Sequence, residues 1–393
     1  MHVVTSETMR RIDEIAIDEM GIPGIDLMHR AGEAIARISS GFYDDLACKG
    51  YIGIFAGPGN NGGDGWVCAR LLKSKDYPVK VFSVVLPDNL TGDARTAFEE
   101  ARDAGVDCRI VEAESIDISG MGMAIDALLG TGAKGTPRGA VGEIVRLLAM
   151  AELPIIAVDN PTGADADNGS VEGIAIPAIA TVSLALPKLG QFLYPAREFV
   201  GQLFVADIGI PNEAISRASG DIDYRVDTAS DLAALLPFRA GDGHKGTFGK
   251  ASIIAGSTGM TGAVALSAES ALRSGAGLVE AVVPEGIVSI VDSLVLEIIT
   301  RGVPQVAKHK CLSIRALGDI VRIANEADAI AFGPGIGTHR ETVDLTARLL
   351  LRLIKPTVID ADALNCIAKL MRRDVPVKFG CPVVITPHPG ELS

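Results

Sequence analysis

The sequence predicts an α/β protein of two domains, each a parallel β-sheet covered by helices. The chain has 393 residues, more than one domain usually contains. Hydrophobic residues make up 48% of it but aromatic residues only 4%, and 44 residues are glycine. This composition is typical of α/β layers packed with small aliphatic side chains. Short apolar runs alternate with helical patterns along the chain, which indicates repeated βα units.

Two helices are expected before the first strand. The first begins at Thr5 or Ser6, carries Met9 on its apolar face and ends at Gly21. The second, over residues 26–38, has apolar side chains at helical spacing along one face. We expect these two helices to cover one flank of the sheet that follows.

A strand, a glycine-rich segment and a helix come next, and the rest of the domain is organised around them. The strand is expected over 51–55 and the helix over 66–73. Between them, Ala56–Gly65 holds six glycine or proline residues, so no regular structure is expected there. Glycines allow close approach of a ligand, and a helix start binds anions, so this segment predicts a nucleotide site. The alternative is a tight turn with Asp64 as the helix cap.

Further strands and helices then alternate, which predicts a doubly wound parallel sheet with its ligand site at the carboxyl ends of the strands. The expected strands are 79–85, 123–126, 155–159, 180–186 and 203–208, and the expected helices are 91–105 and 139–150.

Three loops are expected to meet at that edge of the sheet. They are Asn60–Asp64, Asp126–Thr136 and Asp159–Gly163, and each follows a strand. The second loop also brings Lys134 towards the carboxylates.

The carboxylates of Asp64, Asp126 and Asp159 repel one another, so a cation is expected among them. Oxygen atoms of Asn61, Asp126 and Thr162 form a ligand set suited to a hard cation. The alternative for each aspartate alone is a carboxylate that caps a loop.

A second α/β unit is expected after a small, polar boundary segment, 216–223. Its last strand is followed by a glycine turn and then by Ser393, with no helix, so we expect this domain to be incomplete. Its expected helices are 227–236 and one ending at Ser274, and its expected strands are 251–255, 278–283, 329–332, 357–360 and 383–386.

Charge and cysteine usage exclude several classes of function. The net charge of −13 argues against nucleic-acid binding. The most apolar stretch, Ile174–Leu186, is interrupted by Pro177 and is too short to span a membrane. The six cysteines are widely spaced and no secretory signal precedes them, so they predict free thiols in a reducing cytosol.

The motifs of both halves resemble known families. Gly57–Gly65, Asp126–Gly132 and Val158–Gly163 resemble the NAD(P)H-hydrate epimerase family, the YjeF N-terminal domain. The second half resembles the ADP-dependent NAD(P)H-hydrate dehydratases, which have a ribokinase-like fold. The segments that carry this second resemblance are His244–Gly246, Gly333–Gly337, Asp360–Asn365 and Thr386–Glu391.

The resemblance implies a Rossmann-like epimerase domain over 1–215 and a ribokinase-like dehydratase domain over 226–393. It implies repair of damaged nicotinamide cofactors, with the hydrates NADHX and NADPHX as substrates. The epimerase would interconvert their R and S forms. The dehydratase would remove water from the S form with ADP or ATP, and with Mg²⁺. The resemblance also implies a homo-oligomer.

Site residues follow from the resemblance position by position. A potassium ion would bind Asn61, Asp126 and Thr162, and Ala263, Gly335 and His388 would contact the hydrate in the dehydratase. Asp159 is the first candidate for the epimerase acid or base, with Lys134 as a phosphate or hydroxyl partner. The hydrate site of the epimerase would consist of Asn60, Asn61, Gly62, Gly63, Asp64, Gly130, Thr131, Gly132, Ala133, Lys134, Gly135, Thr136 and Asp159.

The catalytic Gly-Thr-Gly-Asp segment of the dehydratase family would lie beyond Ser393, so we expect weak or absent dehydration by this chain. Two other functions stay open at this point. One is a small-molecule kinase of the ribokinase type with an accessory domain, which would release a stable phosphorylated product. The other is a nucleotide-binding scaffold without catalytic activity.

Overall fold

The computed structural model describes residues 1–111, 116–218, 224–236, 238–239 and 241–392. The chain divides into two compact units, Met1–Leu236 and Pro237–Ser393. The predicted boundary segment overlaps helix α7 up to Ala218, and its residues 219–223 lie outside the described part. The domain limits 1–215 and 226–393 stay predictions. Each unit is described by itself below.

The first unit contains a seven-stranded sheet in the order β4-β3-β2-β5-β6-β7-β8, with all neighbours parallel. The strands are β2 (Tyr51–Ala56), β3 (Val79–Ser83), β4 (Asp107–Ile110), β5 (Met121–Ala127), β6 (Ile155–Val158), β7 (Ala180–Leu184) and β8 (Gln202–Ala206). A separate antiparallel pair joins β1 (His2–Val3) to β9 (Tyr224–Arg225).

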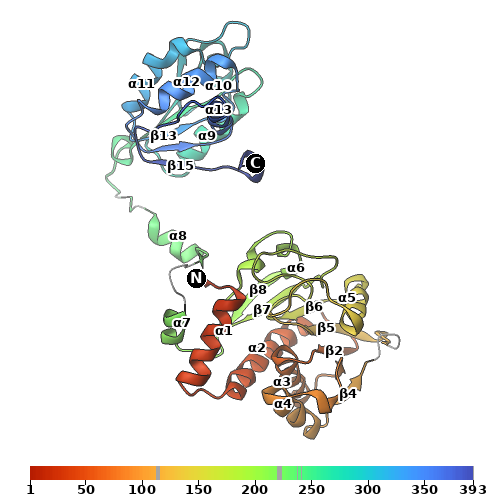
Figure 1. The fold of residues 1–393 in the computed structure, drawn as a ribbon. Helices are drawn as coiled ribbons and strands as arrows, with labels where there is room; N and C mark the ends of the chain where they lie inside the picture. Colours follow the sequence, from red (N-terminus) through yellow and green to blue (C-terminus); the bar gives the residue numbers. More distant parts are fainter. Residues whose placement is uncertain (112–115, 219–223, 237, 240, 393) are drawn as a thin grey trace. The chain divides into compact units, whose positions relative to one another are not determined.

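Helices cover both faces of this sheet (Figure 1). On one face, α2, α3 and α4 pack on a core that includes Trp66, while α5 covers the other face with Ile144 and Leu148. Helix α1 continues as a π-helical turn, Ile15–Glu19, and packs with α7. The helices are α1 (Ser6–Glu14), α2 (Gly24–Asp45), α3 (Asn60–Ser74), α4 (Gly92–Asp103), α5 (Gly139–Met150), α6 (Arg197–Val200), α7 (Asn212–Ala218) and α8 (Ala229–Leu235).

The strand order explains where a ligand site forms. From β2 the chain builds the sheet outwards through β3 and β4, then returns to β5 on the other side of β2. The loops after β2 and β5 therefore leave the sheet in opposite directions and open a crevice between them. These are the two glycine-rich loops that the sequence identifies.

The prediction that Ala56–Gly65 has no regular structure is wrong, because α3 begins at Asn60 with Gly59 as its cap. Asp64 is therefore inside the helix and does not cap it. The glycines serve close packing. A Cβ atom at Gly57 would lie 1.7 Å from the Leu128 carbonyl oxygen, and one at Gly62 would lie 2.0 Å from the Gly57 carbonyl oxygen.

The second unit has the same layered plan, with a six-stranded parallel sheet in the order β12-β11-β10-β13-β14-β15. Helices α9 and α10 share one core cluster, and α11, α12 and α13 share the other. Its elements are β10 (Lys250–Ile254), α9 (Thr261–Arg273), β11 (Leu278–Pro284), α10 (Val288–Leu294), β12 (Ile299–Val303), α11 (Leu317–Asn325), β13 (Ala329–Phe332), α12 (Arg340–Leu350), β14 (Thr357–Ile359), α13 (Asp362–Met371), β15 (Val383–Ile385) and α14 (Pro389–Leu392).

The predicted α/β class with parallel sheets is confirmed in both units. The sequence analysis missed the edge strands β4 and β12, which carry few consecutive apolar residues: Asp107–Ile110 and Ile299–Val303. Among the described residues, no helix combines the length and the apolar character needed to cross a membrane.

Replacing Gly57 or Gly62 with alanine is expected to lower the free energy of unfolding of the first unit by about 2 kcal/mol or more, because backbone atoms must move. Gly59→Ala is the matched control, since a Cβ there meets no atom within 4 Å. Fluorescence of Trp66, the single tryptophan, reports unfolding of this unit in urea. Equal stability of the three variants would contradict the close-packing role.

Candidate functional site

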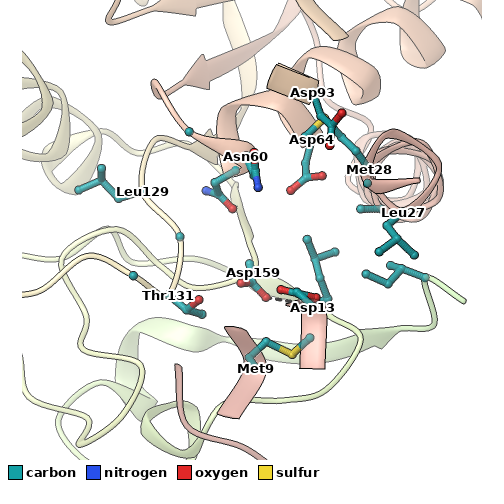
Figure 2. A pocket seen from close by; sticks show the side chains of 18 of the residues that line it. Met9, Asp13, Leu27, Met28, Asn60, Asp64, Asp93, Leu129, Thr131 and Asp159 are labelled. Atoms are coloured by element: carbon teal, nitrogen blue, oxygen red, sulfur yellow. Dashed lines mark hydrogen bonds between the residues drawn. The ribbon is translucent and has the colours of Figure 1, made fainter. Parts of the chain in front are cut away.

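A cavity of about 530 Å³ lies at the β2/β5 crevice of the first unit (Figure 2). The first turn of α3, the loop after β5 and Asp159 after β6 form its polar side. Helices α1 and α2 contribute apolar side chains, including Met9, Leu27 and Met28. A cavity of this size with a few converging polar groups suits a bound small molecule.

The structure brings most of the predicted hydrate-site residues to this cavity. The predicted residues that line it are Asn60, Asn61, Asp64, Gly130, Thr131, Gly132, Ala133 and Asp159. Gly62 and Gly63 are buried in the first turn of α3, and the remaining three, Lys134, Gly135 and Thr136, are not among the lining residues.

The centre of the site is an ion pair between Asp159 and Lys188. The Lys188 side chain is fully buried, and its Nζ donates to Asp159 Oδ1 and, at 3.0 Å, to the Leu184 carbonyl oxygen. Asp159 Oδ1 also accepts from the Leu184 N–H at 3.0 Å. Gln191 Nε2 donates to the Asp159 carbonyl oxygen at 2.6 Å. The loops after β6 and β7 are therefore joined through one carboxylate.

Asp159 has a positive φ of 62°, which is uncommon for a residue with a side chain. The hydrogen bonds at its carboxylate and carbonyl, and the bond from its N–H to the Val182 carbonyl oxygen at 2.8 Å, fix this conformation. Backbone held in this region of φ, ψ space is a recurring property of functional sites.

Three further carboxyl groups line the cavity without a hydrogen-bond partner in the described part of the chain: Asp13 from α1, Asp64 from α3 and Asp93 from α4 (Figure 2). Burial raises the pKa of Asp13 to about 6; the Lys188 ammonium lowers this pKa and the Asp159 carboxylate raises it. Burial, then Asp159 and Asp13, raise the pKa of Asp64 well above its ordinary value. Carboxyl groups whose pKa is raised in this way suit proton transfer.

The proposed cation ligands Asp126 and Thr162 lie together, and neither is among the residues that line the cavity. Thr162 donates to Asp126 through its N–H at 2.8 Å and its hydroxyl at 2.7 Å, and Leu128 N–H adds a third bond at 3.2 Å. Burial raises the pKa of Asp126 to about 6 despite these three hydrogen bonds. Among the described residues, the buried Asn61 Nδ2 has no hydrogen-bond partner.

Asn61 lies beside Gly130, where an added Cβ atom would be 3.4 Å from the Asn61 Cβ. The neighbouring Leu129 N–H donates to the Thr162 hydroxyl at 3.2 Å. Asn61, Asp126 and Thr162 are therefore linked through the loop after β5. Across the described residues, no group of three or more His, Cys, Asp or Glu side chains could hold a metal ion.

Lys134 is exposed and pairs with Asp167, with Nζ 3.3 Å from Oδ2. Asp167 also accepts from the Ser6 N–H at 2.5 Å, and the Ser6 hydroxyl donates to the Thr131 carbonyl oxygen at 2.8 Å. These bonds attach the start of α1 to the loop after β5. Lys134 therefore connects two walls of the cavity from outside.

The sequence analysis missed Lys188 and Asp13. Lys188 follows β7 in a stretch where no motif marks it. Asp13 could have been found from its spacing. Met9, Asp13 and Ile17 are four residues apart, so they share one face of a helix, and all three line the cavity. An acidic residue on the apolar stripe of a helix indicates a buried polar site.

In the second unit, Gly335 and Ala263 lie together at the crevice between β10 and β13, since a Cβ at Gly335 would be 3.2 Å from the Ala263 Cβ. Ser257 Oγ donates to the Gly335 carbonyl oxygen at 2.8 Å, and this bond joins the loop after β10 to the loop after β13. His388 follows β15 and is exposed; its recorded contacts are local, with Gly390 N–H and Glu391.

Comparisons with known proteins match both halves of the chain to described families. The family described as YjeF-related protein N-terminus matches residues 24–190, and the family described as NAD(P)H-hydrate dehydratase matches residues 251–393. A bifunctional NAD(P)H-hydrate repair enzyme of Moorella thermoacetica is 39% identical over 100% of this chain and 74% of its own length. The chain belongs to this family.

The enzyme of that name from Escherichia coli is 31% identical, over 99% of this chain and 70% of its own length. The crystal structure of the ADP/ATP-dependent NAD(P)H-hydrate dehydratase from Bacillus subtilis, co-crystallised with ATP and Mg²⁺, is 30% identical. That comparison covers 42% of this chain and 53% of the Bacillus chain, with a TM-score of 0.33. The repair-enzyme family is thus matched along both units, and Asp13 lies before the first matched segment.

Replacing Lys188 with methionine is expected to lower the free energy of unfolding of the first unit by about 3 to 5 kcal/mol, because Asp159 is left as a buried charge without a partner. Urea unfolding followed by Trp66 fluorescence measures this loss. Lys75→Met, at an exposed lysine, is the control. The double variant K188M/D159N should recover part of the stability, and an unchanged K188M would contradict the ion pair's role.

Replacing Asp13 with asparagine is expected to change how stability depends on pH. Because the folded-state pKa is raised from 3.8 to about 6, the ionised carboxylate destabilises the wild-type fold as pH rises through 6. Asp13→Asn should therefore gain up to about 3 kcal/mol over wild type between pH 4 and pH 8. Exposed Asp18→Asn is the control. Parallel stability profiles of D13N and wild type would show that Asp13 is not buried as described.

Proposed function

We propose that the cavity of the first unit binds the hydrates of NADH and NADPH and interconverts their R and S forms. In the whole repair enzyme, the second unit, which belongs to the dehydratase family, removes water from the S-hydrate with ADP or ATP and Mg²⁺. Together the two activities restore damaged nicotinamide cofactors. The family matches favour this function over the small-molecule kinase and the scaffold.

The observation that carries the epimerase proposal is the position of Asp159 where both glycine loops meet the cavity. Epimerisation at ring carbon 6 requires the bond from this carbon to its hydroxyl, or to the ring nitrogen, to break and re-form. A carboxyl group beside the hydroxyl assists that step as acid or base. Lys188 holds Asp159 in place, and Met9, Leu27 and Met28 limit access of bulk water.

The start of α3 suits the phosphates of the hydrate. Gly59 and Asn60 line the cavity at the N-terminus of a 15-residue helix, where unpaired N–H groups and the helix dipole favour an anion. The pyrophosphate is then placed at this end of the cavity and the nicotinamide ring near the carboxyl groups. Lys134, which is exposed and follows the lining residue Ala133, is a candidate phosphate partner.

The residues present fit a potassium ion at Asn61, Asp126 and Thr162. The Asn61 side-chain oxygen, the buried Asp126 carboxylate and the Thr162 hydroxyl supply oxygen ligands suited to such an ion. When bound, potassium supplies positive charge to a buried carboxylate. The protein's own part is to hold the loop after β5 through Thr162 and Leu129, and Asn160 Nδ2 closes the next loop on the Ala164 carbonyl oxygen at 2.7 Å.

In the second unit, Ala263, Gly335 and His388 are the candidate hydrate contacts. The loops after β10 and β13 open at the corresponding crevice, and Ala263 stands in the first turn of α9. All six cysteines are free thiols, and a location in the cytosol stays a prediction. Assembly into a homo-oligomer stays a prediction.

The decisive experiment separates the R and S hydrates of NADH and incubates each with the chain in potassium buffer without nucleotide. Chromatography should show interconversion. Asp159→Asn is expected to slow it by about 100-fold or more, because the acid–base group is removed. Exposed Asp45→Asn is the matched control. Wild-type rates in D159N would exclude Asp159 from catalysis, and no interconversion by the unaltered chain would refute the epimerase function.

A further inference from the structure

Asp64 is a buried carboxyl group that the fold leaves without a partner. Its side chain is 6% exposed, and no hydrogen bond to it is recorded in the described part of the chain. It lies in the second turn of α3, with the buried thiol of Cys68 one turn further on. Burying such a group costs free energy unless another molecule satisfies it. The group that can do so is a ligand in the cavity.

The direction of the Asp64 side chain supports this conclusion. Figure 2 shows its carboxyl group pointing into the cavity from α3, while Asp159 and Asp13 point into it from the facing side. Asp159 belongs to the end of β6 and is paired with Lys188, whereas Asp64 faces no cation at hydrogen-bond distance among the described residues. A flat ring bound between the two walls would present one face to each carboxyl group.

The two carboxyl groups also differ in their surroundings. Asp159 accepts hydrogen bonds from the Lys188 ammonium and from the Leu184 N–H. Burial, together with the negative charges of Asp159 and Asp13, raises the pKa of Asp64 well above its ordinary value, and the Lys188 ammonium lowers this pKa to a smaller extent. The cavity thus has a carboxyl group paired with a cation on one wall and a carboxyl group without a cation partner, among the described residues, on the facing wall (Figure 2).

We propose that Asp64 is a second catalytic residue, which serves the face of ring carbon 6 opposite to the face served by Asp159. This inference rests on the proposed epimerase function. An epimerase must make and break a bond on both faces of one carbon atom, and a single carboxyl group fixed on one wall reaches only one face.

The step balances as follows. Asp64 gives its proton to the hydroxyl group on carbon 6, the carbon–oxygen bond breaks, and water leaves as the lone pair of the ring nitrogen forms a C=N bond. A water molecule then adds to carbon 6 from the other face, and Asp159 takes its proton. The product is the opposite epimer, and the proton returns from Asp159 to Asp64 through water. For the other epimer the two carboxyl groups exchange roles.

The test uses oxygen exchange at carbon 6. Each separated hydrate of NADH is incubated in water enriched in ¹⁸O with the wild-type chain, with Asp64→Asn and with Asp159→Asn, and a sample without protein gives the background. Interconversion is expected to fall by about 100-fold or more in D64N. D64N and D159N should each retain exchange, with retained configuration, for one epimer only, and the two variants should retain it for opposite epimers.

A merely structural role for Asp64 would slow exchange of both epimers equally, and this result would overturn the inference. Inversion without ¹⁸O uptake by the wild-type chain would also overturn it, because carbon–oxygen cleavage would be absent.

Asp45→Asn controls for an altered surface charge. Trp66, two residues from Asp64, reports whether D64N is folded; if it is unfolded, Asp64→Glu replaces it and should keep exchange of both epimers at a reduced rate. If wild-type interconversion is absent, the proposed function itself fails.

Discussion

The buried ion pair of Asp159 and Lys188 is the interaction on which the candidate site depends. It joins the loop after β6 to the loop after β7, and it holds Asp159 at a positive φ that its side chain disfavours. Two charges removed from water are tolerated only when each has further hydrogen bonds, and here the Leu184 backbone supplies bonds to both. Because the pair is fixed by backbone groups of the sheet edge, the Asp159 carboxylate has one position in the cavity.

Negative charge is the second constraint on the site. Asp13, Asp64, Asp93 and Asp159 line one cavity, where Lys188 is the one lysine among the described lining residues. Such a group cannot be fully ionised without further positive charge, so protons or a cation must be held there. The arrangement places one carboxyl group beside the Lys188 ammonium and another, with a raised pKa, on the facing wall without a cation partner among the described residues (Figure 2).

Much of the fold could be predicted because the hydrophobic periodicity and the positions of glycine and proline agree with the observed helices and strands. Helix α5 spans the predicted 139–150, and the strands predicted over 123–126 and 155–159 are observed as β5 (Met121–Ala127) and β6 (Ile155–Val158). The start of α3 could not be read from Ala56–Gly65, because glycine favours loops locally whereas here it permits helix and strand to pack closely. Lys188 could not be found either, since its role arises only when β7 brings it beside Asp159. The pair forms because the fold brings two separate loops together, and no local sequence motif indicates it.

A crystal structure of D64N with a bound hydrate of NADH would test the central claim most directly. The account predicts that ring carbon 6 lies between the two walls, with the residue 64 side chain and the Asp159 carboxylate on opposite faces of the ring and each about 3 to 3.5 Å from the carbon-6 hydroxyl or from the water that would replace it. A ring bound with both side chains on the same face, or outside this cavity, would contradict it.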